Sequence, residues 1–118
     1  MKLVLPLPPT LNSTYKIGRY RNMYKAKHAT DWEVEALNDI RKQIGSFKTI
    51  EGKCWITIKM LITHERDIDS SIKILLDCLQ KGKIYLNDRL VGRLSIMKIK
   101  VKVNPRVEVE VGENGKKG

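Results

Sequence analysis

The chain has 118 residues and carries 23 Lys and Arg against 13 Asp and Glu, which gives a formal net charge of +10. A chain of this length forms one domain with its own core, so the sequence predicts a single domain over residues 1–118. The charge favours a polyanionic partner, nucleic acid above all. Because no apolar run reaches about 18 residues, we expect no membrane span and a cytoplasmic protein. Cys54 and Cys78 lack the spacing of a zinc site and are expected to be buried thiols.

The N-terminal region predicts a strand followed by a basic arm. Residues 2–7 read as a strand that ends at Pro8-Pro9, because proline cannot donate to a sheet ladder. After a loop over 10–14, basic and aromatic residues alternate from Tyr15 to Lys27, around residues that favour the turn of a hairpin. Cations bind phosphates and aromatic rings stack on bases. The DNA-binding candidates in this arm are Lys16, Arg19, Arg21, Lys25 and Lys27. The alternative is a solvated hairpin whose tyrosines pack on the core.

A first helix and a central strand follow. Thr30 and Glu33 form a capping box, which predicts a helix that begins at Thr30, continues to Ile44 and ends at Gly45. Its apolar positions, Trp32 among them, recur at helical spacing and are expected in the core. Residues 55–63 are rich in Ile, Thr and aromatic side chains and predict a strand.

The next segment brings two acids to the junction between this strand and a second helix. Asp67 and Asp69 are two residues apart, so an extended backbone would point both carboxylates to one side. Asp69 is the expected N-cap of the helix, and Gly82 the expected C′ residue. Lys73 follows Asp69 by one turn. We expect the helix to return the chain to the same edge, where Asp88 would join the acids. Its apolar face consists of Ile68, Ile72, Leu75, Leu76 and Leu79.

This combination of residues suggests metal-dependent chemistry on a phosphodiester. Mg²⁺ prefers carboxylate oxygens, with water and phosphate completing its coordination. Such a metal activates water and neutralises developing charge, and a nearby Lys adds positive charge. Alternatively, Asp69 only caps the helix, and Asp67 forms a surface ion-pair cluster with Arg66 and Lys73 that contributes little to stability.

The C-terminal region predicts a strand pair. Residues 95–103 alternate apolar residues with Lys, residues 104–105 favour a turn, and residues 106–111 read as the partner strand. We expect a hairpin whose lysines face its glutamates, and a flexible tail over 113–118. The order of elements predicts an α+β fold with a mixed β-sheet and two helices packed on it. The residues expected to face one another are Lys98, Lys100, Lys102, Glu108 and Glu110.

The acidic segment resembles a known family pattern. The RusA family of Holliday-junction resolvases has the pattern R-D-[IL]-D-N-x-x-K, then D, then [FWY]-x-x-D, and opens on L-P-x-P-P-S-x-N. The matching residues here are Arg66-Asp67-Ile68-Asp69, Lys73, Asp77, Tyr85-Leu86-Asn87-Asp88 and the opening Leu5-Pro6-Leu7-Pro8-Pro9-Thr10-Leu11-Asn12. The resemblance spans nearly the whole chain. Ser70 stands where the family usually has Asn.

The resemblance implies a Mg²⁺-dependent, homodimeric endonuclease that resolves four-way DNA junctions by paired symmetric nicks in DNA recombination and repair. Asp67, Asp69 and Asp88 would bind one or two Mg²⁺ ions, which Mn²⁺ could replace, and Lys73 would be essential for cleavage. We add Arg66 to the DNA-binding candidates. No small-molecule cofactor is expected, and the location would be the cytoplasm of a bacterial or phage-infected cell. The strand at the N-terminus and the first helix are the expected dimer surface.

Two other function classes compete with this interpretation. A non-catalytic basic nucleic-acid-binding module, such as a ribosomal protein, would bind in a salt-dependent way without needing magnesium. Another metal-dependent nuclease, such as a toxin-type RNase, would prefer linear duplex or RNA over a four-way junction.

Overall fold

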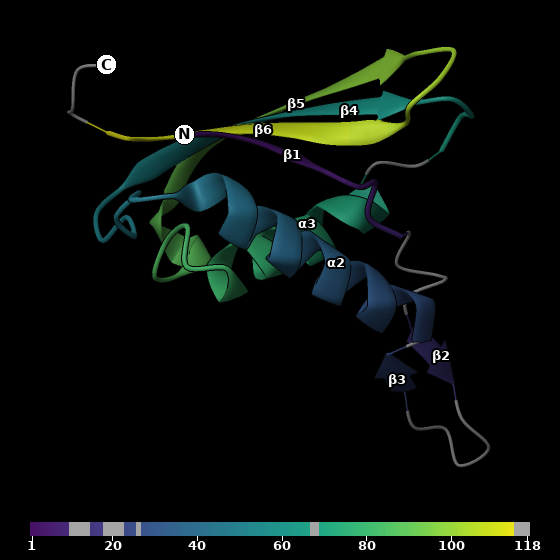
Figure 1. The fold of residues 1–118 in the computed structure, drawn as a ribbon, viewed down its shortest axis with the longest axis horizontal. Coiled ribbons are helices and arrows are strands. Elements are labelled where there is room, and N and C mark those ends of the chain that lie inside the picture. The colour runs from purple at the N-terminus through teal and green to yellow at the C-terminus, as the bar shows by residue number, and fades with distance from the viewer. Residues whose placement is uncertain (10–14, 18–22, 26, 67–68, 115–118) are drawn as a thin grey trace.

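A four-stranded mixed sheet with two helices against one of its faces forms the body of the molecule (Figure 1). The computed structural model describes residues 1–9, 15–17, 23–25, 27–66 and 69–114, and only the backbone of 15–17, 23–25, 27–29, 69 and 70. The elements are β1 (Lys2–Leu5), β2 (Tyr15–Ile17), β3 (Met23–Lys25), α2 (Lys27–Ile44), β4 (Cys54–Ile62), α3 (Asp69–Lys81), the 3₁₀ helix η1 (Asp88–Leu90), β5 (Val91–Lys100) and β6 (Arg106–Glu113). The expected α+β fold is confirmed.

The main sheet has the strand order β1-β6-β4-β5. Strand β4 lies between β6, which is antiparallel to it, and β5, which is parallel to it. Strand β1 pairs with β6 in antiparallel register, with Leu3 opposite Val109. A parallel pair needs a crossover connection, and helix α3 provides it between β4 and β5.

The predicted hairpin between the last two strands is wrong. Strand β4 separates β5 from β6, and the two glutamates of β6 have other neighbours: Glu108 stands opposite Lys59, and Glu110 opposite Lys2. The alternating pattern of a strand shows which face is buried but not which strand lies beside it. Ile56 and Ile58 of β4 are almost fully buried, which fits a central position between two neighbours.

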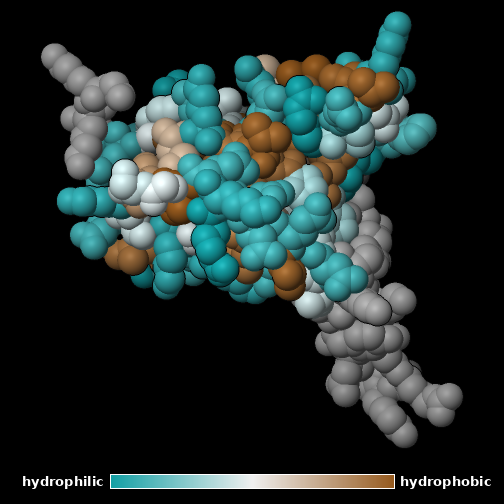
Figure 2. Space-filling view, in the orientation of Figure 1, coloured by the Kyte–Doolittle hydropathy of each residue, from teal (hydrophilic) through white to brown (hydrophobic). Residues whose placement is uncertain are grey.

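The core lies between the sheet and the two helices. Trp32, Ala36 and Ile40 of α2 are buried, as predicted, and the Trp32 Nε1 donates a hydrogen bond of 3.0 Å to the Pro6 carbonyl. The thiols of Cys54 and Cys78 are buried, also as predicted. Figure 2 shows mostly hydrophilic residues over the described surface on this side. The burial of apolar area therefore holds the helices against the sheet.

The ends of the helices differ from the predictions in two places. Helix α2 begins at Lys27, ahead of Thr30, and ends as expected before Gly45, whose φ is 55°. At the end of α3 the left-handed residue is Lys83, with a φ of 66°, and not Gly82. The Lys83 N–H donates to the Gln80 carbonyl and the Ile84 N–H to the Leu79 carbonyl, as in a Schellman motif. Gly82 serves packing instead, because a Cβ there would lie 2.9 Å from Ile40 Cδ1.

The basic arm is a separate antiparallel hairpin of β2 and β3, which extends away from the main sheet (Figure 1). The expected turn over 18–22 lies outside the described residues. At the other end of the chain, β6 continues through Glu113, and the Asn114 N–H donates 2.8 Å to the Lys53 carbonyl. Both residues belong to the segment expected as a tail, of which 115–118 lie outside the described residues.

Candidate active site

The acidic junction lies where β4 ends and α3 begins. Asp69 is the first residue of α3, which confirms its predicted place at the start of the helix; the structure describes only its backbone. Asp67 lies outside the described residues. Lys73 stands one helical turn after Asp69 and is exposed. The segment therefore presents a lysine at the end of the helix where the two acids enter it.

Arg66 fastens this junction to the rest of the molecule. Its Nη2 donates to the Pro8 carbonyl at 2.6 Å and to the Ser71 hydroxyl at 2.5 Å. Ser71 is fully buried in α3. Burial of the Arg66 guanidinium lowers its pKa from the ordinary value, although an arginine stays charged in proteins. We expected Arg66 to bind DNA, but these hydrogen bonds turn its side chain toward the protein.

Strand β5 fastens the same junction from the other side. The Lys98 ammonium forms an ion pair with the Glu65 carboxylate and lies 3.5 Å from the Arg66 carbonyl. The hydrogen bond from the Lys98 ammonium to the Glu65 carboxylate lowers the pKa of Glu65. The Val101 N–H also donates 2.8 Å to the carbonyl of Ile62, the last residue of β4. Lys98 thus supports the junction and does not face Glu108 as predicted. No local sequence pattern predicts this contact, since it depends on β5 being the parallel neighbour of β4.

The contribution of the Arg66–Ser71 hydrogen bond to the free energy of unfolding can be measured. Ser71→Ala is expected to lower the free energy of unfolding by about 1–3 kcal/mol, because a buried charged donor loses an acceptor. Denaturant unfolding would measure the change. Ser46→Ala, at an exposed serine in the turn after α2, is the matched control and is expected to stay within about 0.5 kcal/mol of wild type. Equal stability of the two variants would show that the Arg66 contact with Ser71 contributes nothing measurable.

Asp88 lies at the opposite end of α3 from the other two acids. Its backbone N–H donates a hydrogen bond of 2.9 Å to Gln80 Oε1, near the last turn of α3. Residues 69 and 80 of a helix are separated by about 16 Å at 1.5 Å per residue. The expectation that α3 returns Asp88 to the same edge is therefore wrong for a single chain. A crossover helix runs antiparallel to both strands that it connects, so it carries the chain back to the start of β4, where Cys54 pairs with Val91.

The structure describes only some of the predicted metal ligands. Among residues 1–9, 15–17, 23–25, 27–66 and 69–114, no group of three His, Cys, Asp or Glu side chains is placed to hold a metal ion. Asp67 and the side chain of Asp69 lie outside the described part of the chain. Two carboxylates at one helix start are a donor set that fits Mg²⁺, which is typically bound by one or two carboxylates and keeps several waters.

The DNA-binding candidates of the arm are placed by their backbone. Lys16 lies in β2 opposite Tyr24 of β3, and Lys25 lies opposite Tyr15, so each lysine has an aromatic residue as its partner in the register. Lys27 is the first residue of α2. Arg19 and Arg21 lie outside the described residues. The arm therefore combines cations and aromatic residues as predicted, and its contact with DNA stays a prediction.

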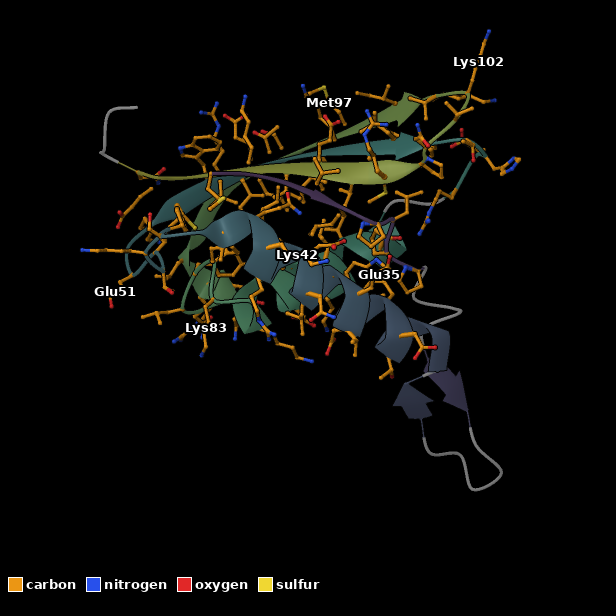
Figure 3. The ribbon with its side chains drawn as sticks, in the orientation of Figure 1. Glu35, Lys42, Glu51, Lys83, Met97 and Lys102 are labelled. Carbon is orange, nitrogen blue, oxygen red and sulfur yellow. The ribbon has the colours of Figure 1, made fainter. Side chains whose placement is uncertain are left out.

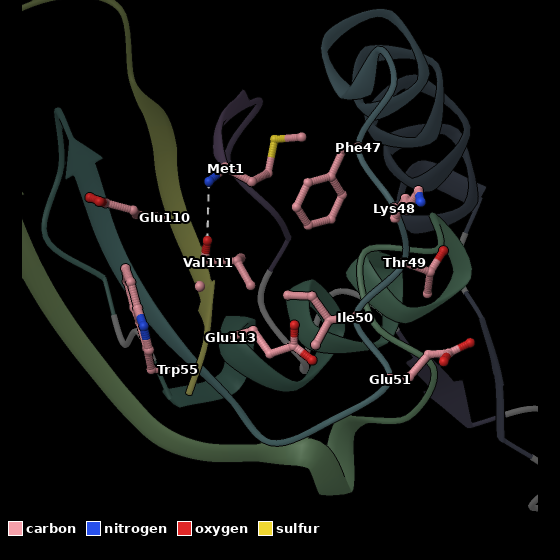
Figure 4. A pocket seen from close by; sticks show the side chains of 11 residues that line it. Met1, Phe47, Lys48, Thr49, Ile50, Glu51, Trp55, Glu110, Val111 and Glu113 are labelled. Atoms are coloured by element: carbon pink, nitrogen blue, oxygen red, sulfur yellow. Dashed lines mark hydrogen bonds between the residues drawn. The ribbon is translucent and has the colours of Figure 1, made fainter. Parts of the chain in front are cut away.

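A groove lies away from the junction (Figure 4). It has a volume of about 1020 Å³ and is lined by Met1, Phe47, Trp55, Glu51 and Glu113, among others. The Met1 ammonium donates 3.1 Å to the Val111 carbonyl beside it. The ring of Trp55 covers Gly112, where a Cβ would overlap it, so Trp55 serves packing as predicted. The groove contains none of the predicted catalytic residues.

No helix in the described residues is long and apolar enough to cross a membrane.

The fold and the site define a basic α+β protein whose acidic strand-to-helix junction is held in place by an arginine and a lysine. The sequence pattern of the family described as "Endodeoxyribonuclease RusA" matches residues 6–112. The chain therefore belongs to the RusA family and is an endodeoxyribonuclease, as the resemblance implied.

A curated relative agrees with this membership. The chain is 28% identical over 93 residues to the "Crossover junction endodeoxyribonuclease RusA" of Aquifex aeolicus (strain VF5). The matched segment covers 78% of this chain and 74% of the relative. The similarity therefore extends well beyond the acidic segment.

Proposed function

We propose that this endodeoxyribonuclease resolves four-way DNA junctions by paired symmetric nicks, as a Mg²⁺-dependent homodimer acting in recombination and repair. The observation that carries the proposal is the family match over residues 6–112, which includes the whole acidic junction. The printed name of the Aquifex relative, a crossover junction nuclease, supports the choice of substrate. The net charge of +10 fits a partner with closely spaced phosphates.

Asp67 and Asp69 would hold the metal, as one or two Mg²⁺ ions or as Mn²⁺ in their place. When bound, the metal supplies an activated water and neutralises charge on the phosphate. Lys73, exposed one turn beyond Asp69, offers a positive charge to the same phosphate. Arg66 and Lys98 position the junction through their contacts with Pro8, Ser71 and Glu65.

Asp88 would act on the partner subunit's site. Ligands of one Mg²⁺ ion lie about 2.1 Å from it, so they cannot be spread along a helix of this length. The separation of about 16 Å along α3 therefore excludes Asp88 from the site of its own chain. A two-fold homodimer can bring Asp88 of one chain to Asp67 and Asp69 of the other, and it also supplies the two equivalent sites that paired nicks require.

The experiment is cleavage of a labelled synthetic four-way junction, with Mg²⁺ and with EDTA. We expect symmetric paired nicks that need the metal, and little cleavage of linear duplex or RNA of the same sequence. Salt should weaken binding steeply, because each phosphate contact releases counterions. Binding of the junction without cleavage in any divalent metal would refute the proposed activity. Preference for linear duplex or RNA would leave a nuclease but refute the junction as its substrate.

A further inference from the structure

Two lysines near the end of β5 lack the partners that the sequence predicted for them. Strand β4 separates β5 from β6, so the hairpin that would pair Lys100 and Lys102 with the glutamates of β6 does not form. Lys100 is the last residue of β5 and stands opposite Ile62 of β4, while Lys102 lies in the connection to β6. Both side chains are exposed. Among the described residues, neither ammonium forms an ion pair.

These lysines lie at the end of the sheet that carries the acidic junction. The Val101 N–H, between them in the chain, donates a hydrogen bond of 2.8 Å to the carbonyl of Ile62, the last residue of β4. Glu65, which follows that strand, has its pKa lowered chiefly by the hydrogen bond from Lys98 and further by the charge of Lys100. The positive charge of Lys100 therefore acts on the segment that leads into the acids.

The connection between β5 and β6 holds Lys102 away from the sheet. Asn104 has a φ of 57°, a left-handed conformation that Asn tolerates better than most residues. Its carbonyl accepts a hydrogen bond of 3.0 Å from Arg106 Nη1, and Arg106 Nε pairs with the Glu108 carboxylate at 3.0 Å. Arg106 thus holds the turn in shape. Figure 3 shows the Lys102 side chain extending from this connection into solvent, where an outside partner can meet it.

The β5–β6 connection and the basic arm lie on two sides of the end of β4. Figure 1 shows both at this end of the molecule, with the connection on one side of the strand end and β2 and β3 on the other. The arm contributes Lys16 and Lys25 from its paired strands. Duplex DNA carries about one phosphate charge per 1.7 Å of its axis. A duplex bound at the acidic junction would therefore present phosphates to cations on both sides.

We propose that Lys100 and Lys102 are positioning residues that bind phosphates of the duplex lying over the acidic junction, across from the cations of β2 and β3. This inference rests on the proposed function, because the phosphates belong to the four-way junction that the enzyme cuts. Lysine is a flexible point charge, so it reaches a phosphate oxygen without a fixed geometry. The two lysines set where the strand lies relative to Asp67 and Asp69, and they do not act on the reacting phosphate.

The test is binding of a labelled synthetic four-way junction in EDTA, at several salt concentrations, by wild type and by Lys100→Ala with Lys102→Ala. Each phosphate contact contributes about 0.9 to the slope of log affinity against log salt. Loss of both contacts should lower the slope by about two and weaken binding at least about tenfold at about 0.1 M salt. Single-turnover cleavage with Mg²⁺ at saturating protein should stay near the wild-type rate, since the acids and Lys73 are unchanged.

Two further variants separate a phosphate contact from net charge and from folding. Lys42→Ala with Lys48→Ala removes the same charge from the last turn of α2 and the loop after it, and should leave the slope near that of wild type. Lys100→Arg with Lys102→Arg keeps both charges and should retain wild-type binding. Because all four lysines are exposed, each variant should keep its fold by circular dichroism. Lys100→Gln with Lys102→Gln keeps most of the side-chain length and should bind as weakly as the alanine pair.

An unchanged slope in the alanine and glutamine pairs would overturn the proposal and leave the two lysines as solvated surface charges. An equal loss in the Lys42 and Lys48 control would also overturn it, because net charge alone would then explain the result. Wild-type cleavage decides the proposed function separately. A wild type that binds the junction without cutting it would refute the function, while the salt slopes would still test Lys100 and Lys102.

Discussion

Asp67→Asn is expected to lower the rate of junction cleavage about a thousand-fold, because loss of one carboxylate ligand removes several kcal/mol of transition-state stabilisation at about 1.4 kcal/mol per tenfold. Asn keeps the shape of the side chain but gives up the charge that attracts the metal. Junction affinity should stay equal or rise, since an acid near phosphate is lost. Single-turnover cleavage and a binding titration on the same labelled junction would measure the two effects separately.

The matched control for this variant is Asp31→Asn. Asp31 is an exposed residue of α2, and its replacement removes the same charge outside the acidic segment. It should cut at the wild-type rate. If Asp67→Asn also cut at that rate, Asp67 would not be a metal ligand. The alternative, in which Asp69 only caps the helix, would then be favoured.

Mixed dimers of Asp67→Asn and Asp88→Asn subunits are expected to regain activity that neither variant has alone. If Asp88 acts on the partner's site, each mixed dimer holds one intact site, formed by Asp67 of one chain and Asp88 of the other. Random mixing makes half of the dimers mixed, so about a quarter of the sites should be restored. Each mixed dimer should make single nicks and lose the paired ones.

Two different affinity tags on co-expressed subunits would isolate the mixed dimer for this measurement. A tagged mixture of wild type with Asp67→Asn controls for the tags and for exchange, and should retain activity. A mixed dimer as inactive as both parents would place Asp88 and Asp67 in the same site of one chain. That result would contradict the position of Asp88 near the last turn of α3, at the opposite end of the helix from Asp69.

Local patterns in the sequence predicted much of the fold. The helical spacing of Trp32, Ala36 and Ile40 identified a buried face, and all three are in the core. The acids before α3 were placed at a strand-to-helix junction, and Asp69 does begin that helix. The turn-favouring residues between Tyr15 and Lys27 predicted a hairpin, and β2 and β3 do pair there. Each of these features depends on residues close together in the chain, so periodicity and capping preferences suffice to detect it.

The errors came from contacts between distant segments. The lysines of β5 were matched with the glutamates of β6 because the two strands are neighbours in sequence, but β4 lies between them. Gly82 has the residue type of a C′ position, whereas its lack of a side chain is needed beside Ile40.

By itself, then, the sequence determined the charge of the protein, its α+β class and its family pattern, and it supplied Asp67, Asp69 and Lys73 as the candidate site residues. Only the tertiary structure decided that Arg66 bonds to Pro8 and Ser71 and that Lys98 supports the junction. It also decided that Asp88 lies at the far end of α3. The physical reason is that a side-chain pattern specifies which face of an element is buried, while the direction and order of strands are set by how the elements pack together.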